Sequence, residues 1–210
     1  RALLKHLGIF CRDQRLDDAS HKAFTRRVGK IFIHPNFNTG EGDPEIVRVV
    51  RQPGDERIIG EEWHSDTTMM PEPPMGAILY AHEVPPYGGD TLFANQYLAW
   101  ETLSDGMKAM LANLKVVHSD IKVAGPHNNL NARRSSKIRE DSNWRPTENV
   151  HPAVRTHPET GRKCLFVNHS YARRFDGMTE DESRPLLPAP VHHRHRPEPP
   201  RRFRARAGAI

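Results

Sequence analysis

Two segments of the chain have the apolar spacing of an amphipathic helix. The first follows the aspartate pair at 17–18, which can cap it, and stops at Gly29. The second starts at Ser104 or Asp105 and keeps its helical spacing of apolar side chains to Leu114. Both segments have polar residues on the opposite face, so we expect each helix to pack on a core along one side.

Shorter apolar runs, bounded by Gly, Pro and polar residues, predict strands. The shorter predicted elements are a helix over residues 2–7 that stops at Gly8 and strands over 9–11, 31–33, 46–50, 76–81, 150–156 and 165–167. Several short strands with flanking helices favour a mainly β fold, either a sandwich or a barrel with helical decoration.

Residues 119–149 differ from the segments around them. Gly125-Pro126, several Asn and a mixture of charges with Ser make this stretch unlike a core segment. A long excursion of this kind is either a lid over an active site or a disordered surface loop, and the sequence leaves both open.

Length and composition suit one domain. A chain of 210 residues can bury a sizeable core, and its start at Arg1 rather than Met leads us to expect an incomplete chain. The chain has no apolar run near the roughly 18 residues of a membrane span, and since no charged-then-apolar stretch appears at its start we expect no secretion. Cys11 and Cys164 lie far apart in apolar surroundings. We expect two reduced core thiols, a cytoplasmic protein and no membrane partner.

The net charge of +5 comes from the C-terminal end of the chain. Residues 1–187 carry 25 basic and 25 acidic side chains, whereas residues 188–210 carry six Arg against Glu198 alone. The body of the protein therefore lacks the basic footprint of a nucleic-acid-binding surface, and we expect no nucleic-acid partner.

A His-x-Asp triplet at 64–66 is the candidate for metal chemistry. In extended backbone, His64 and Asp66 project to the same side and can bind one ion. One further His would complete the two-His, one-carboxylate set that leaves open positions on Fe(II) for a co-substrate and O2. The same triplet recurs at 118–120, directly after an apolar run, and we interpret that copy as the end of a strand.

The surroundings of the first triplet resemble those of a known family of enzymes. The matching pieces are Trp63-His64-Ser65-Asp66, Pro73 to Leu79, Gly88 to Leu92, Phe10 to Gln14, His34-Pro35, Val154 to Pro158 and Leu165 to Asn168. Together they cover nearly all of residues 1–187 and resemble the taurine catabolism dioxygenase (TauD/TfdA) family. The resemblance implies a double-stranded β-helix, or jelly roll, whose late strands are missing from this chain.

The resemblance also implies a reaction and its cofactors. Family members use Fe(II), with 2-oxoglutarate and O2 as co-substrates, to hydroxylate a small anionic substrate such as a sulfonate, a sulfate ester or an aryloxyalkanoate. His64 and Asp66 would bind the iron, and Thr91 would hydrogen-bond the 2-oxoglutarate carboxylate. No other catalytic residue is expected beyond the metal centre, and a homo-oligomer is left open.

Four residues match substrate-binding positions of the family. They are His34, Phe37, Thr67 and Tyr171. Phe37 and Gly60 stand where taurine-hydroxylating members carry tyrosine and asparagine, so the resemblance argues against taurine as the substrate.

The resemblance fails near the C-terminus. It places the second metal-binding histidine and the arginine that pairs with 2-oxoglutarate beyond Ile210. Residues 188–210 instead form an Arg/His/Pro-rich stretch that we expect to be aberrant or disordered, and we expect His192, His193 and His195 not to be native ligands. We therefore predict a partial dioxygenase domain over 1–187 that is inactive as a fragment. The alternative is a non-catalytic jelly-roll module that binds a ligand.

Overall fold

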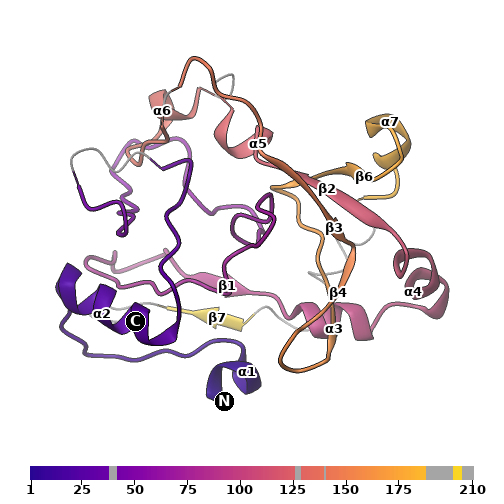
Figure 1. Ribbon diagram of the computed structural model, residues 1–210. Helices are drawn as coiled ribbons and strands as arrows, with labels where there is room; N and C mark the ends of the chain where they lie inside the picture. The colour runs from indigo at the N-terminus through magenta and orange to yellow at the C-terminus, as the bar shows by residue number, and fades with distance from the viewer. Residues whose placement is uncertain (38–41, 126–128, 140, 188–200, 205–210) are drawn as a thin grey trace.

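The computed structural model describes residues 1–37, 42–125, 129–139, 141–187 and 201–204. Within these ranges the strands pair antiparallel in three small sheets. In the largest, β2 (Lys115–Ser119) lies between β3 (Glu148–Pro152) and β6 (Ala172–Phe175). The others are β4 (Val154–Thr156) with β5 (Lys163–Leu165), and β1 (Thr91–Phe93) with β7 (Arg201–Phe203) (Figure 1).

Seven described helices flank these sheets. They are α1 (Ala2–His6), α2 (Asp18–Val28), α3 (Gln96–Glu101), α4 (Asp105–Leu111), α5 (Ile121–Ala124), α6 (Leu130–Arg133) and α7 (Glu180–Ser183). The combination of antiparallel sheets with flanking helices agrees with the sequence prediction, although the described helices contain more residues than the described strands.

Local capping chemistry explains where the predicted helices begin and end. Asp17 accepts a hydrogen bond from the Ser20 backbone N–H in a capping box, and Gly29 ends α2, as predicted. Ser104 caps α4 in the same way. The predicted stop of the first helix was wrong by one residue, because Leu7 itself adopts the left-handed conformation with φ 65° that ends α1.

Four predicted strands were wrong within the described chain. The segments 9–11, 31–33, 46–50 and 76–81 are irregular, and their apolar side chains include exposed ones such as Ile9 at 51% and Leu79 at 68%. A short apolar run can form a strand only where a partner strand supplies the ladder, and the described residues place none beside these segments.

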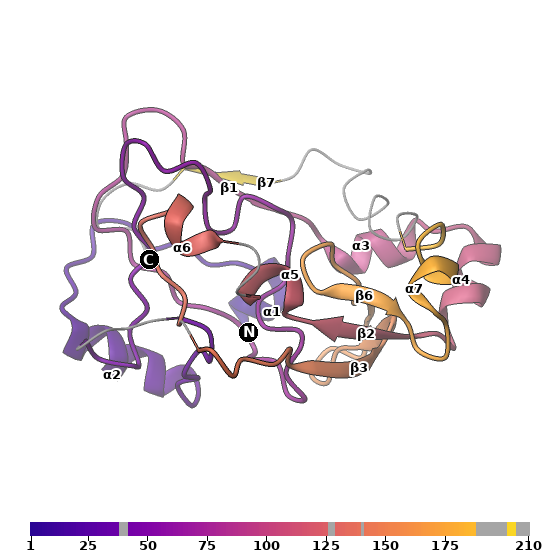
Figure 2. The ribbon, with the colours of Figure 1, turned by 90° about the horizontal axis from the view of Figure 1, so that it is seen from above.

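The core lies between the three-stranded sheet and the helices α3 and α4. Its buried members are Ala99, Leu103, Leu111, Val116, Ala153, Leu165, Val167, Ala172 and Phe175. Figure 2 shows α3, α4 and α7 gathered at the same end of the molecule as this sheet. His64 and Asp66 of the candidate site lie on a loop outside this core.

The described parts of residues 119–149 pack against the first half of the chain. Ser136 is buried, and its hydroxyl bonds both the N–H and the carbonyl of Val50, at 2.7 and 2.8 Å. The Arg133 carbonyl accepts from the backbone N–H groups of Glu56 and Arg57. This stretch therefore anchors loops 50–57, and its function as a lid stays a prediction.

The two cysteines are free, as expected, but only one is sheltered. Cys164 is half-buried, and burial raises the pKa of its thiol. Cys11 is exposed, so its placement in the core was wrong. None of the described helices combines the length and apolarity that crossing a membrane requires.

Phe175 is a direct test of this core, since its side chain is fully buried. We expect Phe175→Ala to lower the free energy of unfolding by about 3–5 kcal/mol through lost burial and a cavity. Val150→Ala, at a side chain that is 45% exposed, should change it by less than about 0.5 kcal/mol. Urea unfolding followed by circular dichroism measures both, and equal losses would contradict this placement of the core.

Candidate metal and anion site

His64 and Asp66 bring two metal-binding atoms together. Nε2 of His64 lies 3.3 Å from Oδ1 of Asp66. Two ligand atoms at about 2.1 Å from one ion, separated by an angle of roughly 90–100°, lie about 3.0–3.3 Å apart. The pair therefore fits two neighbouring positions in one coordination sphere.

The other ring nitrogen of His64 fixes how the imidazole is presented. Nδ1 lies 2.6 Å from the Glu62 carbonyl oxygen, which only accepts, so Nδ1 carries the proton and donates it. Nε2 faces Asp66, where a metal ion would replace the proton that this nitrogen donates to the carboxylate, and a backbone carbonyl orients the ring as in many metal sites.

Gly60 packs against the edge of the same ring. Its φ is +78°, and a Cβ at this position would lie 3.3 Å from Cε1 of His64. Two features favour glycine at this position: the left-handed backbone conformation and the close approach of the imidazole ring.

Asp66 is held in its ionised form. The hydrogen bond from His64 lowers the pKa of this carboxyl, and the charges of His64 and His34 act in the same direction against the effect of burial. The Asp66 side chain is nevertheless 60% exposed. An ionised and accessible carboxylate suits a metal ligand that shares its ion with further groups.

Two ligands alone do not make the expected set of three. Within the ranges that the structure describes, no three His, Cys, Asp or Glu side chains are placed to hold a metal. His192, His193 and His195 lie outside those ranges. The residues present thus fit part of an iron site, with a donor pair of the expected chemistry and spacing.

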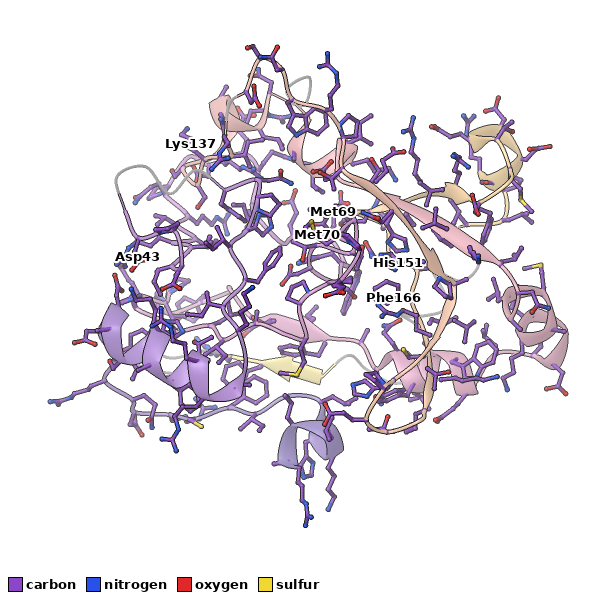
Figure 3. The ribbon with its side chains drawn as sticks, viewed as in Figure 1. Asp43, Met69, Met70, Lys137, His151 and Phe166 are labelled. Atoms are coloured by element: carbon purple, nitrogen blue, oxygen red, sulfur yellow. The ribbon has the colours of Figure 1, made fainter. Side chains whose placement is uncertain are left out.

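A cavity of about 270 Å³ opens beside Asp66. Its lining consists of Ser65, Asp66, Thr68, Pro73, Pro74, Met75, Gly76 and Phe166. Strand β3 supports this side, because Asn149 and His151 hydrogen-bond the carbonyls of Met69 and Met70, at 2.6 and 2.9 Å. Figure 3 shows Met69, Met70, His151 and Phe166 gathered in the middle of the molecule.

Three of the four predicted substrate residues surround Asp66. His34 accepts a hydrogen bond at Nδ1 from the Asn36 backbone N–H, and burial lowers its pKa while Asp66 opposes that shift. His34 is therefore neutral near pH 7, with its proton on Nε2. Its ring also contacts Phe37, the fourth predicted residue, at a centroid distance of 4.7 Å.

Thr67 and Tyr171 complete this cluster. Thr67 has φ +47°, a strained conformation for a β-branched residue, and its buried hydroxyl has no partner among the described side chains and backbone groups. Burial, followed by the charge of Asp66, raises the pKa of Tyr171 to about 12. The phenol therefore keeps its proton and can donate it.

Thr91 stands apart from this cluster in the structure. It begins β1, pairs with Phe203 and is exposed. It does not line the cavity beside Asp66. Its role in binding 2-oxoglutarate stays a prediction.

The second His-x-Asp triplet forms hydrogen bonds to segments of the candidate site. The sequence interpretation missed these contacts. The triplet does end strand β2, as predicted. Nδ1 of His118 lies 2.8 Å from the Thr68 hydroxyl, and Asp120 accepts from the Asn36 amide at 2.9 Å. The sequence signal for these contacts was a polar triplet following an apolar run, and such a pattern does not reveal that Thr68 and Asn36 are the hydrogen-bond partners.

Comparison with known proteins identifies the family. The model of the family described as "Taurine catabolism dioxygenase TauD, TfdA family" matches residues 1–210. An alpha-ketoglutarate-dependent sulfonate dioxygenase of Saccharomyces cerevisiae is 31% identical over 172 residues, which are 78% of this chain and 40% of the relative. An alpha-ketoglutarate-dependent sulfate ester dioxygenase of Pseudomonas putida is 28% identical over 211 residues, covering 100% and 69%.

A solved structure supports the same assignment. The taurine dioxygenase of Burkholderia xenovorans superposes with a TM-score of 0.70 at 33% identity, over 95% of this chain and 63% of that one. The chain thus spans between 40% and 69% of the length of these three relatives.

Replacing Gly60 tests the contact with His64. We expect Gly60→Ala to displace the imidazole and shift its ring signals in NMR spectra, because the added Cβ meets Cε1 at 3.3 Å. Gly54→Ala is the matched control, since its φ is +96° and an added Cβ meets nothing within 4 Å. Equal shifts in both variants would assign the effect to backbone strain alone.

His118 should make stability depend on acidity. Burial, followed by His151, lowers its pKa to about 3 from 6.5, so the unfolded chain binds a proton that the folded chain refuses. Stability should therefore fall as pH drops from about 6.5 towards 3, by up to about 1.4 kcal/mol per pH unit. His118→Asn, which keeps an acceptor for Thr68 but does not titrate, should flatten urea-unfolding profiles over this window. An unchanged slope would contradict the buried neutral state.

Proposed function

Since the chain belongs to the taurine catabolism dioxygenase (TauD/TfdA) family of 2-oxoglutarate-dependent dioxygenases, we propose that the protein hydroxylates a small anionic organic substrate. The substrate class is a sulfonate, a sulfate ester or an aryloxyalkanoate, and the cofactors are Fe(II), 2-oxoglutarate and O2. The observation that carries this proposal is the donor pair of His64 and Asp66, whose Nε2 and Oδ1 atoms lie 3.3 Å apart.

Each residue of the cluster has a defined part in this proposal. His64 and Asp66 hold Fe(II), and Thr91 donates its hydroxyl hydrogen bond to a carboxylate of 2-oxoglutarate. When bound, these cofactors supply an oxidation in which 2-oxoglutarate loses CO2 to give succinate and one oxygen atom of O2 enters a substrate C–H bond. The protein orients the reactants and limits the access of water.

The groups near Asp66 suit an anionic substrate. His34 offers a neutral N–H, Tyr171 a phenol that stays protonated, and Thr67 a buried hydroxyl with no described partner. Neutral donors bind an anion without placing a second full charge beside the metal. Phe37 adds an apolar wall against His34. With Phe37 and Gly60 at their positions, we propose a substrate other than taurine.

The finer points of architecture and location belong to the same proposal. The structural match to a taurine dioxygenase supports a double-stranded β-helix for the complete domain, with residues 1–187 as its part in this chain. Two free cysteines suit a reducing compartment, so we propose that the protein acts in the cytoplasm.

Metal binding by the chain tests the donor pair. We expect Mn(II), used as an oxygen-stable probe and followed by electron paramagnetic resonance, to bind with an affinity that His64→Ala and Asp66→Ala each lower at least about tenfold. His82→Ala is the control, because His82 is an exposed histidine that contacts Tyr80. Equal affinity in all four proteins would exclude this pair as the metal site.

Catalysis is assayed with a longer protein than the metal test uses. We expect succinate formation that depends on Fe(II), O2 and 2-oxoglutarate when this chain is extended by the C-terminal segment of the Pseudomonas putida relative. Sulfonates, sulfate esters and aryloxyalkanoates are the substrates to assay. No activity with any of them would contradict the proposal. Anion binding that survives His64→Ala and Asp66→Ala would support a non-catalytic binding module instead.

A further inference from the structure

Three consecutive residues at the end of β2 contact three separate segments of the candidate site. His118 meets Thr68, the Ser119 backbone N–H donates to the Tyr171 carbonyl at 2.8 Å, and Asp120 meets Asn36. The register of β2 against β6 shifts between Val117 and His118. Such irregularities redirect side chains and are common beside active sites.

The contact of His118 bears on the metal pair. His118 is fully buried, and its Nδ1 and the Thr68 hydroxyl form a hydrogen bond of 2.8 Å, while the same hydroxyl accepts from the Asn168 amide at 3.1 Å. Thr68 comes two residues after Asp66, in the turn that the Met70 N–H closes on the Thr67 carbonyl. Fixing Thr68 therefore restrains the turn that carries Asp66.

The contact of Asp120 bears on the anion side. Its two carboxylate oxygens accept from the Thr147 backbone N–H and from the Asn36 amide, both at 2.9 Å. The Asn36 backbone N–H in turn donates to Nδ1 of His34 at 3.1 Å. Asp120 thereby restrains the residue that sets which nitrogen of His34 carries the proton.

The contact of His118 and the contact of Asp120 have different partner side chains, on different segments of the chain. His118 reaches residues 66–70 and Asp120 reaches residues 34–37. A fully buried carboxylate is costly to keep, and its two hydrogen bonds offset that cost only while both partners stay in place. This places a constraint on Asn36 that an apolar residue at position 120 would not impose.

We propose that His118 and Asp120 are positioning residues with separate tasks, His118 for the metal pair and Asp120 for the tautomer and placement of His34. The proposal deepens the proposed function and rests on it for the roles of His64, Asp66 and His34. Neither residue touches the metal or the substrate in this scheme. Each acts through one intermediate residue, Thr68 or Asn36.

The test uses two disruptive variants and two conservative ones. His118→Leu removes the hydrogen-bond partner of Thr68, whereas the amide of His118→Asn retains one. Asp120→Ala removes both carboxylate oxygens that accept hydrogen bonds. Asp120→Asn keeps one oxygen to accept from the Thr147 N–H, and its new NH2 group can donate to the Asn36 side chain once the Asn36 amide rotates by 180°. Ser183→Ala is the structural control, since the buried Ser183 hydroxyl accepts from the Phe175 backbone N–H in the same sheet.

Ring ¹⁵N and proton NMR signals of the full chain without metal are the primary measurement. We expect His118→Leu to shift the His64 signals without changing the tautomer of His34, and Asp120→Ala to change the tautomer of His34 and leave the His64 signals unchanged. The conservative variants should restore the wild-type signals, and Ser183→Ala should move neither ring. If His118→Leu also changes the His34 tautomer, if Asp120→Ala leaves that tautomer unchanged, or if the control moves the rings equally, the proposal is overturned.

Mn(II) affinity then separates this proposal from the proposed function. His118→Leu should weaken Mn(II) about tenfold, as loss of a supporting contact does at other metal sites, while Asp120→Ala should leave it unchanged. Equal weakening by both variants would contradict separate tasks. If the wild-type chain binds no Mn(II) but each disruptive variant still affects only the histidine ring expected for it, the positioning roles stand and the proposed metal binding is wrong.

Discussion

Three consecutive polar residues are buried at the end of β2, and irregular segments of the chain supply at least one hydrogen-bond partner to each of them. His118, Ser119 and Asp120 are at most 1% exposed. Buried polar groups without partners cost folding free energy, so each partner segment has to lie where the strand end requires it. Residues 36, 68, 147 and 171 are all tied to this point.

This constraint explains how a site can form on segments with little regular structure. The hydrophobic core lies with α3, α4 and the three-stranded sheet, and none of the described residues before Ala99 is among its buried members. The loops that carry His34 and His64 to Thr67 are held by polar contacts instead. The strain at Thr67 and the close approach of Gly60 to His64 persist because these contacts fix the surrounding backbone.

The electrostatics of the cluster follow from the same burial. Asp66 stays ionised because His64 bonds it, whereas burial keeps His34 and Tyr171 neutral. One anionic ligand thus faces several neutral donors. A carboxylate beside neutral donors can hold a cation and an anion side by side.

By itself, the sequence determined the features that depend on neighbours along the chain. The caps of α2 and α4 were predictable because Asp17 and Ser104 bond backbone groups three residues away. The proximity of the His64 and Asp66 side chains was predictable because residues two apart in extended backbone project to the same side, and their binding of iron stays a prediction. Helix α1 shows the limit of such local rules, since it ended at Leu7 and not at Gly8.

Only the tertiary structure decided which distant groups meet. Strands over 9–11, 31–33, 46–50 and 76–81 were wrongly predicted because pairing is non-local and an apolar run does not name its partner. For the same reason two identical triplets received different roles. The His-Ser-Asp at 64–66 lies on an accessible loop, whereas the copy at 118–120 is buried and hydrogen-bonded to neighbouring segments. Burial separates the two, and burial is a property of the folded chain.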